Sequence, residues 1–252
     1  MAQTAQAVEL RPETLEQFES YIKTAEAAMD GALQSGAPFF WSERSPQTMQ
    51  RIRDGHIVAE FWSGTGPAKI TKGLIHDWVG AALVPQVTVS DVLALIQDYD
   101  HHMNIYAPEV IDSKLLSRRG NDFRVYLRLL KKKIITVVLD TEHDVHYRAL
   151  DRTRWTCRSY STRIAEVHDA ETSSEKTLPP DTGYGFLWRL HSYWRFEQRH
   201  EGTYVECRAI SLTRDVPFGM GWIIEPIIQK LPRESLIATL EATRRALQVK
   251  TG

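Results

Sequence analysis

The first amphipathic segment of the chain runs from Arg11 to Leu33. Its apolar residues recur every three or four positions, which is the spacing of one face of an α-helix. These residues are Leu15, Phe18, Tyr21, Ile22, Ala25, Met29 and Leu33. Pro12 suits the first turn of a helix, and residues 35–38 are of types that end one. The pattern predicts a helix packed on the outside of the main body, with Phe39-Phe40-Trp41 docked beside it.

From His56 onward the apolar residues alternate with a period of two, which is typical of β-strands. Residues 56–62 and 70–84 are predicted to form two strands joined by a turn that contains glycine and proline. Residues 87–91 then offer capping side chains for a helix that ends near Pro108. The first half of the chain therefore predicts a hairpin followed by a short helix.

The middle of the chain is a run of strands with no helix in it. The alternating segments are 110–116, 123–130, 134–150, 154–167, 184–199 and 204–214. Consecutive strands joined by short turns form an antiparallel sheet. The polar segment 168–182, which contains two prolines, is predicted to be an exposed loop.

Helical spacing returns at the C-terminus, from Trp222 to Leu247, where Pro226 and Pro232 are expected to bend or restart the helix. Long antiparallel strands coil, and a sheet with one apolar face must wrap around something. The pattern predicts an α+β fold in which a curved antiparallel β-sheet wraps around a long C-terminal α-helix, with an extra N-terminal helix. We expect residues 1–54 to form an N-terminal helical extension and residues 55–252 the main domain.

Alternation within residues 184–199 separates a ring-rich face from a polar face. The polar face, which carries Arg195 and Glu197 beside Glu206 and Arg208 of the next strand, is predicted to be a solvated charge ladder. A two-residue turn at 201–202 would set Val205, Cys207, Ala209 and Ser211 opposite Phe196, Trp194, Ser192 and Leu190, large against small. The rings expected to border a space between sheet and helix are Phe186, Trp188, Trp194 and Phe196.

Composition narrows the function classes. The 252 residues carry 31 basic and 32 acidic side chains, so no strong field exists to hold a nucleic acid. No window approaches the length of apolar sequence that spans a bilayer. The first seven residues lack the basic segment and apolar core of a signal peptide, yet they are similar to the start of a mature exported chain. A cytoplasmic and an exported location therefore both stay open, as does the oligomeric state.

Two histidines, His143 and His146, invite a metal site, but residues three apart on a strand point to opposite faces. We expect no metal there. His143 shares its face with Tyr147, and it is either a polar group of the pocket or a hydrogen-bonded core residue. The segment 98–102 is expected to cap a helix end, with an acid–base pair as the alternative.

The remaining sequence features point to no cofactor. No nucleophile elbow, phosphate-binding glycine loop or dinucleotide fingerprint is present. Cys157 and Cys207 are either two small buried thiols or one bridge between neighbouring strands. Lys131-Lys132-Lys133 is expected to be a solvated turn, with a transient contact to phospholipid headgroups as the alternative.

Two stretches carry a resemblance to a known family. Residues 89–102, followed by Tyr106-Ala107-Pro108, and residues 194–217, which contain Trp194-Arg195-Phe196-Glu197, resemble segments of the helix-grip fold of the START-like or Bet v 1-like superfamily, which includes polyketide cyclase-type proteins. The resemblance covers about residues 55–247, and it implies a cavity for a lipid, sterol, isoprenoid or polyketide-like molecule. The family has no universal catalytic motif, so no catalytic residue is assigned.

Three hypotheses for function follow. The first is a carrier or sensor of an apolar ligand, whose cavity candidates are Phe186, Trp188, Trp194, Phe196, His143, Tyr147 and Trp222. The second is a cyclase, aromatase or hydrolase-like enzyme, in which His143, Tyr147 or Arg154 would polarise a carbonyl or move a proton. The third is an interaction module that uses the N-terminal helix and residues 39–41.

Overall fold

The computed structural model describes residues 8–132, 136–215 and 221–250, and in the last segment it describes the side chains of 231–248. A sheet of ten antiparallel strands forms its centre, with eight of them in the order β2-β4-β12-β11-β8-β7-β6-β5. β3 pairs with β4, and β9 pairs with β8. The strands are β2 (Val58–Phe61), β3 (Ala68–Ile70), β4 (Gly73–Pro85), β5 (Val110–Arg119), β6 (Asp122–Lys132), β7 (Thr136–Ala149), β8 (Arg154–His168), β9 (Lys176–Thr177), β11 (Arg189–Arg199) and β12 (Gly202–Arg214). A separate small pairing joins β1 (Val8–Glu9) to β10 (Thr182–Gly183).

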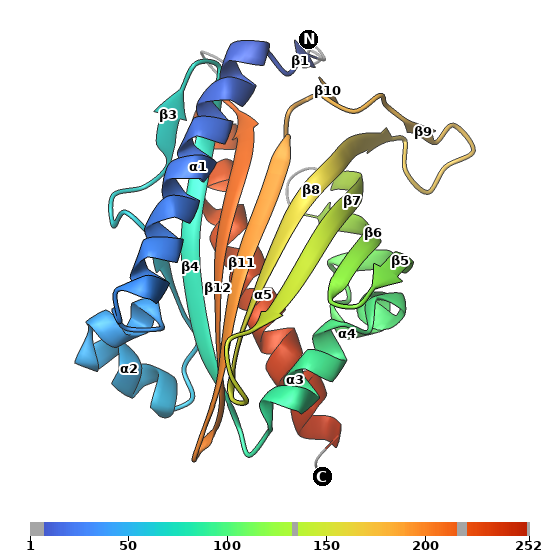
Figure 1. Ribbon diagram of the computed structural model, residues 1–252. Coiled ribbons are helices and arrows are strands. Elements are labelled where there is room, and N and C mark those ends of the chain that lie inside the picture. The colour runs from blue at the N-terminus through green and yellow to red at the C-terminus, as the bar shows by residue number, and fades with distance from the viewer. Residues whose placement is uncertain (1–7, 133–135, 216–220, 251–252) are drawn as a thin grey trace.

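Helices cover both faces of this sheet. On one side lie α1 (Pro12–Gln34), the 3-10 turn η1 (Trp41–Arg44) and α2 (Pro46–Arg53). On the other lies α5 (Gly221–Lys250), together with α3 (Val89–Ile96), η2 (Tyr99–His101) and α4 (His102–Ile105). Figure 1 shows α1 along one face of the curved sheet and α5 along the opposite face. The predicted fold, a curved antiparallel sheet around a C-terminal helix with an extra N-terminal helix, is confirmed.

A glycine on β4 allows a close contact between α5 and the sheet. A Cβ atom added at Gly80 would lie 3.0 Å from side-chain carbons of both Leu236 and Leu240. Both leucines are buried in the core cluster that joins α5, α3 and the concave face. The missing side chain therefore lets α5 lie directly on this part of the sheet.

The N-terminal segment is packed on the convex face through two apolar clusters. Four buried residues of α1 pack against residues of β4, β12 and β11 and the residue just before β11. The helix residues are Phe18, Ile22, Ala25 and Met29, and the sheet-side residues are Ile75, Trp188, Tyr193, Ile210 and Leu212. Phe39 and Phe40 join α2 in a second cluster against Ala81, Leu83 and Tyr204. Whether residues 1–54 are a separable unit stays a prediction.

The expected solvated charge ladder on this face is wrong, because the N-terminal segment covers it. Arg208 donates two hydrogen bonds to Asp77, at 2.9 and 2.6 Å, and both side chains are buried. Glu206 is also buried, and it accepts hydrogen bonds from the backbone N–H groups of Trp41 and Ser42 at 2.9 and 3.2 Å. Burial raises the pKa of Glu206 to about 7. A buried carboxylate or guanidinium is tolerated only when it is paired in this way.

Helix α1 adds further polar contacts on the same face. Asp30 accepts a hydrogen bond from Arg158 at 2.5 Å. Glu26 accepts from the hydroxyls of Tyr160 and Tyr193, at 2.6 and 2.9 Å. The extension is therefore attached through both apolar packing and specific polar partners.

Several element boundaries differ from the sequence expectation. α3 ends at Ile96, and η2 and α4 replace the last turns of the helix predicted to reach Pro108. Pro226 and Pro232 were expected to bend or restart the C-terminal helix, and α5 runs through both as one helix, so the restart is wrong. β11 begins only at Arg189, because positive-φ Gly185 and the irregular segment around it interrupt the alternation predicted from Tyr184.

We expect Gly80→Val to lower the free energy of unfolding by about 1–3 kcal/mol, because the added side chain overpacks the contact with Leu236 and Leu240. Equilibrium urea denaturation measures the change. The control is Gly31→Ala on α1, where an added Cβ has no atom within 4 Å and should cause no loss. Equal stability of Gly80→Val and the native chain would contradict the close contact.

Candidate functional site

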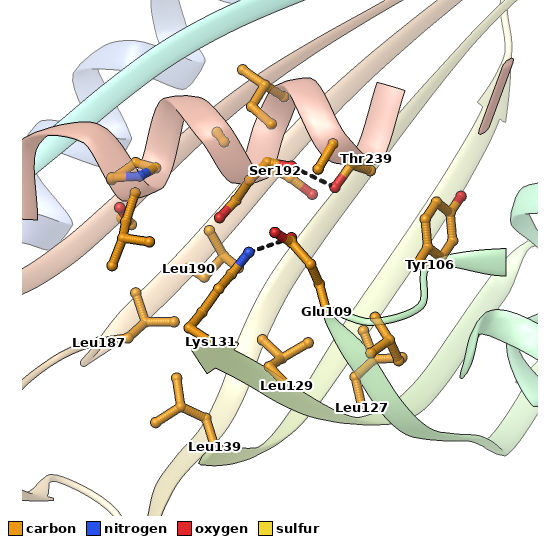
Figure 2. Close-up of a pocket in the computed structure, with 18 of the residues that line it drawn as sticks. Tyr106, Glu109, Leu127, Leu129, Lys131, Leu139, Leu187, Leu190, Ser192 and Thr239 are labelled. Carbon is orange, nitrogen blue, oxygen red and sulfur yellow. Dashed lines mark hydrogen bonds and ion pairs between the residues drawn. The ribbon is translucent and has the colours of Figure 1, made fainter. Parts of the chain in front are cut away.

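A cavity of about 990 Å³ lies between the concave face of the sheet and α5. Strands β6, β7, β8, β11 and β12 supply one wall, α5 supplies the opposite wall, and residues 96–108 close one end. The described lining is predominantly apolar, and Figure 2 shows leucines such as Leu129, Leu139 and Leu190 around the open space. A volume of this size is at the upper end of ordinary small-molecule sites.

Small side chains in the middle of the sheet keep this space open. Three central strands carry a run of small inward residues that line the cavity, namely Cys157, Ser159, Ser192, Cys207, Ala209 and Ser211. Larger rings stand beside them, because Trp194 lies between Cys157 and Cys207 in register, and Tyr147 pairs with Cys157. α5 lies directly on β4, and a gap remains between α5 and strands β12, β11 and β8. The short side chains of these three strands do not fill that gap.

The closed end of the cavity is an aromatic cluster with satisfied polar atoms. The hydroxyl oxygens of Tyr99 and Tyr147 lie 2.7 Å apart. His102, whose ring is tilted by 44° against that of Tyr99, donates from Nε2 to the carbonyl of Ile96 at 3.1 Å. Burial raises the pKa of both tyrosines well above its ordinary value and lowers the pKa of His102 to about 4. All three side chains are therefore uncharged near neutral pH.

One ion pair lies in the cavity wall. Glu109, at the start of β5, pairs with Lys131, near the end of β6, and Figure 2 shows the two side chains pointing toward one another. Lys131 therefore belongs to the cavity, which differs from the solvated turn expected for residues 131–133. Lys132 faces Glu171 at 3.9 Å, and Lys133 lies outside the described residues.

Glu166 shapes the segment that crosses the far end of the cavity. Its carboxylate accepts the backbone N–H groups of Tyr184, Gly185 and Phe186, at 2.7, 2.8 and 3.2 Å. The Glu166 side chain is buried, and an added Cβ at Gly183 would lie 2.5 Å from its oxygen. The carboxylate thus replaces strand pairing for these residues and holds Phe186 in the lining.

Four of the seven predicted cavity residues line the cavity: Phe186, Trp194, His143 and Tyr147. Trp188 instead lies under α1 on the convex face, since Gly185 has φ +76° and the alternation restarts at Arg189. Phe196 is fully buried in the core beside the cavity. The side chain of Trp222 lies outside the described residues. The role of these residues as ligand contacts stays a prediction.

The other candidate groups are not brought together. His143 is buried on the concave face, whereas exposed His146 pairs with Asp122 at 2.5 Å, so the two imidazoles diverge as expected. Arg154 is exposed and pairs with Asp151 at 2.7 Å. Within the described part of the chain, no three potential ligand side chains gather around a metal position.

The two cysteines and the helix-end segment are also located. Cys157 and Cys207 are both free and buried, on strands separated by β11. Asp98 and His101 pair at the surface at 2.7 Å, whereas His102 turns inward. None of the described helices combines the length and the hydropathy that crossing a bilayer requires.

Sequence reasoning did not identify Glu109, Lys131, Glu166 or the serines of β8 and β11 as cavity residues. The two charged groups of the ion pair are far apart in sequence, and no local pattern joins them. The serines did leave a signal, because small residues at alternating positions 157, 159 and 161 indicate an inward face without bulk.

Comparison with solved structures identifies the fold. The crystal structure of a STAR-related lipid transfer protein from Xanthomonas axonopodis superposes with a TM-score of 0.51 at 16% identity, covering 72% of this chain and 97% of the other. The chain has the helix-grip fold of START-like proteins. The resemblance noted in the sequence is thus confirmed for the fold.

Two further solved structures superpose with lower TM-scores. Zhui aromatase/cyclase from Streptomyces superposes with a TM-score of 0.45 at 12% identity, covering 71% of this chain and 96% of the other. Human STARD10 gives 0.46 at 10% identity, covering 82% of each chain. No protein-family model matches the sequence, and no curated protein matches it. The fold assignment rests on the Xanthomonas structure.

We expect Glu166→Gln to release the segment 184–186, because an amide supplies one acceptor oxygen where the carboxylate supplies two. Hydrogen exchange of the Tyr184, Gly185 and Phe186 amides should become faster, with a loss of about 1–3 kcal/mol in unfolding free energy. Asp169→Asn, an exposed change nearby on the same strand connection, is the control. Unchanged exchange of these three amides in Glu166→Gln would contradict the role given to the carboxylate.

Proposed function

We propose that the protein binds or carries a hydrophobic small molecule, of the lipid, sterol, isoprenoid or polyketide-like kind, in the cavity between the sheet and α5. The observation that carries the proposal is the hollow of about 990 Å³ with its predominantly apolar lining. Burying apolar ligand surface there is favourable by roughly 25 cal/mol per Å². A solid core would be the more stable arrangement for a purely structural protein, since interiors normally pack without voids.

The composition of the wall supports binding over catalysis. His143 and Tyr147 are four residues apart on β7, which separates them by about 13 Å along the strand. Tyr147 is hydrogen-bonded to Tyr99, and Arg154 faces solvent. The three groups named for the enzyme hypothesis therefore do not converge on one reacting atom, and we propose no catalytic step.

The fold comparison also supports the proposal of a hydrophobic ligand. The Xanthomonas protein that shares the fold is described as a lipid transfer protein. This likeness concerns the fold, so the proposal for this chain depends on its own cavity. Carriage, as opposed to sensing, would further require release of the ligand to an acceptor.

We expect Ala209→Phe to weaken ligand binding strongly, because Ala209 lines the cavity at the centre of the sheet and a phenyl ring there would occupy part of the cavity. Purified native protein should release an apolar molecule on solvent extraction and should bind the fluorescent probe N-phenyl-1-naphthylamine. The variant should bind this probe at least about tenfold more weakly, as expected when an apolar site is filled.

The matched control is Ala68→Phe, the same substitution on the exposed strand β3. It should leave probe affinity and extraction unchanged, and thermal unfolding should show that both variants are folded. Native protein that neither binds the probe nor releases a ligand would refute the proposal. Equal binding by Ala209→Phe and Ala68→Phe would place the bound molecule elsewhere.

A further inference from the structure

Four polar side chains lie in two adjacent cross-strand rows on the predominantly apolar floor of the cavity. His143, Ser159, Ser192 and Ser211 come from β7, β8, β11 and β12, which are consecutive strands of the sheet. Ser159 and Ser192 are directly paired, and His143 and Ser211 stand one inward position further along their strands. His143 and Ser159 are diagonal neighbours on adjacent strands, because Val145 pairs with Ser159, and such neighbours can contact one ligand group. His143 and Ser211 are three strand spacings apart, roughly 14 Å. We call these four residues the polar belt.

The hydrogen bonds around His143 define its tautomer. The Thr141 hydroxyl donates its proton to the carbonyl of Leu127 at 2.8 Å, so toward His143 it acts as an acceptor. Nε2 of His143 lies 3.1 Å from that oxygen and must therefore carry the proton. Burial lowers the pKa of this histidine to about 4, so the ring is neutral. Nδ1 is left as an acceptor, with no hydrogen-bond partner among the described residues.

The serines offer the complementary donors. Ser192 accepts a hydrogen bond from Nε1 of Trp194 at 3.2 Å, which leaves its own proton available. Within the described part of the chain, the hydroxyls of Ser159 and Ser211 have no hydrogen-bond partner, and both residues line the cavity. A buried polar group that lacks a partner is costly, so a ligand atom that satisfies it gains affinity.

The charges around the cavity do not favour an ionised group at the belt. Asp169, Glu241 and Arg245 are exposed to solvent, and Glu166 is held by three backbone amides. Arg214 and Asp215, charges of opposite sign at the end of β12, also line the cavity and are half-buried. The opposite charges of Glu109 and Lys131 in the cavity wall neutralise each other. None of the belt residues carries a charge, so an anion there would be desolvated without compensation.

We infer that the ligand of this cavity carries an uncharged hydroxyl group, which donates to Nδ1 of His143 and accepts from the neighbouring hydroxyl of Ser159, with the other serines of the polar belt beside it. The inference rests on the proposed function, because it names the chemistry of the molecule held in the same cavity. The preferred class is an alcohol or phenol on an apolar skeleton. A pure hydrocarbon is disfavoured because it has neither a hydrogen-bond donor nor an acceptor. An ether lacks the donor, and a carboxylate carries a charge.

Four probes with one skeleton separate these classes: phenanthrene, 9-phenanthrol, 9-methoxyphenanthrene and phenanthrene-9-carboxylate. Their dissociation constants are measured by displacement of N-phenyl-1-naphthylamine at pH 7. We expect native protein to bind 9-phenanthrol at least about fivefold more tightly than phenanthrene or the ether, the gain of one satisfied hydrogen bond. The carboxylate should bind most weakly.

Two belt variants test the assignment of the residues. His143→Phe removes the acceptor, and the triple change of Ser159, Ser192 and Ser211 to alanine removes the donors without adding bulk. Each should abolish the preference for 9-phenanthrol and leave the affinity for phenanthrene within about twofold, since apolar burial is retained. His146→Phe, on the opposite face of the same strand, should keep the preference.

The outcomes distinguish the two proposals. Absence of binding for all four probes would overturn both. Equal binding of phenanthrene and 9-phenanthrol, tightest binding of the carboxylate, or an unchanged preference in both belt variants would overturn the hydroxyl inference while cavity binding stands. The alanine triple variant keeps the test valid if His143→Phe does not fold.

Discussion

The contact between α5 and β4 at Gly80 decides how much space remains in this protein. Leu236 and Leu240 occupy the position that a side chain at Gly80 would take, so the helix is fixed against one part of the sheet. Small inward residues on β12, β11 and β8 do not reach the helix across the remaining gap. The cavity is thus a consequence of one close approach combined with missing bulk beside it.

The two faces of the sheet differ in whether their polar side chains have hydrogen-bond partners. On the convex face the N-terminal segment covers the strands through apolar clusters, and it supplies partners to two buried carboxylates. The hydroxyl of Tyr21 donates to Asp77, and the backbone N–H groups of Trp41 and Ser42 donate to Glu206. On the concave face the polar atoms of Ser159 and Ser211 and one nitrogen of His143 have no partner among the described residues. A packed outer face keeps the strands in place, which in turn keeps the inner positions apart and the cavity shape defined.

The sequence predicted the parts of the fold that depend on short-range periodicity. The predicted pairing of Trp194 with Cys207 and of Ser192 with Ala209 is confirmed. The two-residue turn between these strands lies at 200–201, one residue before the predicted position 201–202. Trp188 was assigned to the wrong face, because one glycine at positive φ and the carboxylate of Glu166 interrupt the strand before it begins. Such a break depends on a contact 19 residues away in the chain, and local pattern does not contain it.

The incorrect prediction of a solvated charge ladder also arose because a local sequence pattern does not contain tertiary contacts. Charged residues that alternate on a strand normally face water, and nothing local to Glu206 indicates that residues 41 and 42 lie on it. The cavity could be predicted only in part. The sequence showed small residues opposite large ones on neighbouring strands, but it did not show where α5 lies above them. Tertiary contacts at Gly80 and at Glu166 decide both features.

The most direct test of the account uses the indole N–H signals of two tryptophans in a ¹⁵N–¹H correlation spectrum, assigned by Trp194→Phe and Trp188→Phe. Trp194 lines the cavity, and Trp188 lies under α1 on the other face. Titration with N-phenyl-1-naphthylamine should shift the signal of Trp194 and leave that of Trp188 in place. A shift of Trp188 alone, or of neither signal at saturating probe, would contradict a ligand cavity between the sheet and α5.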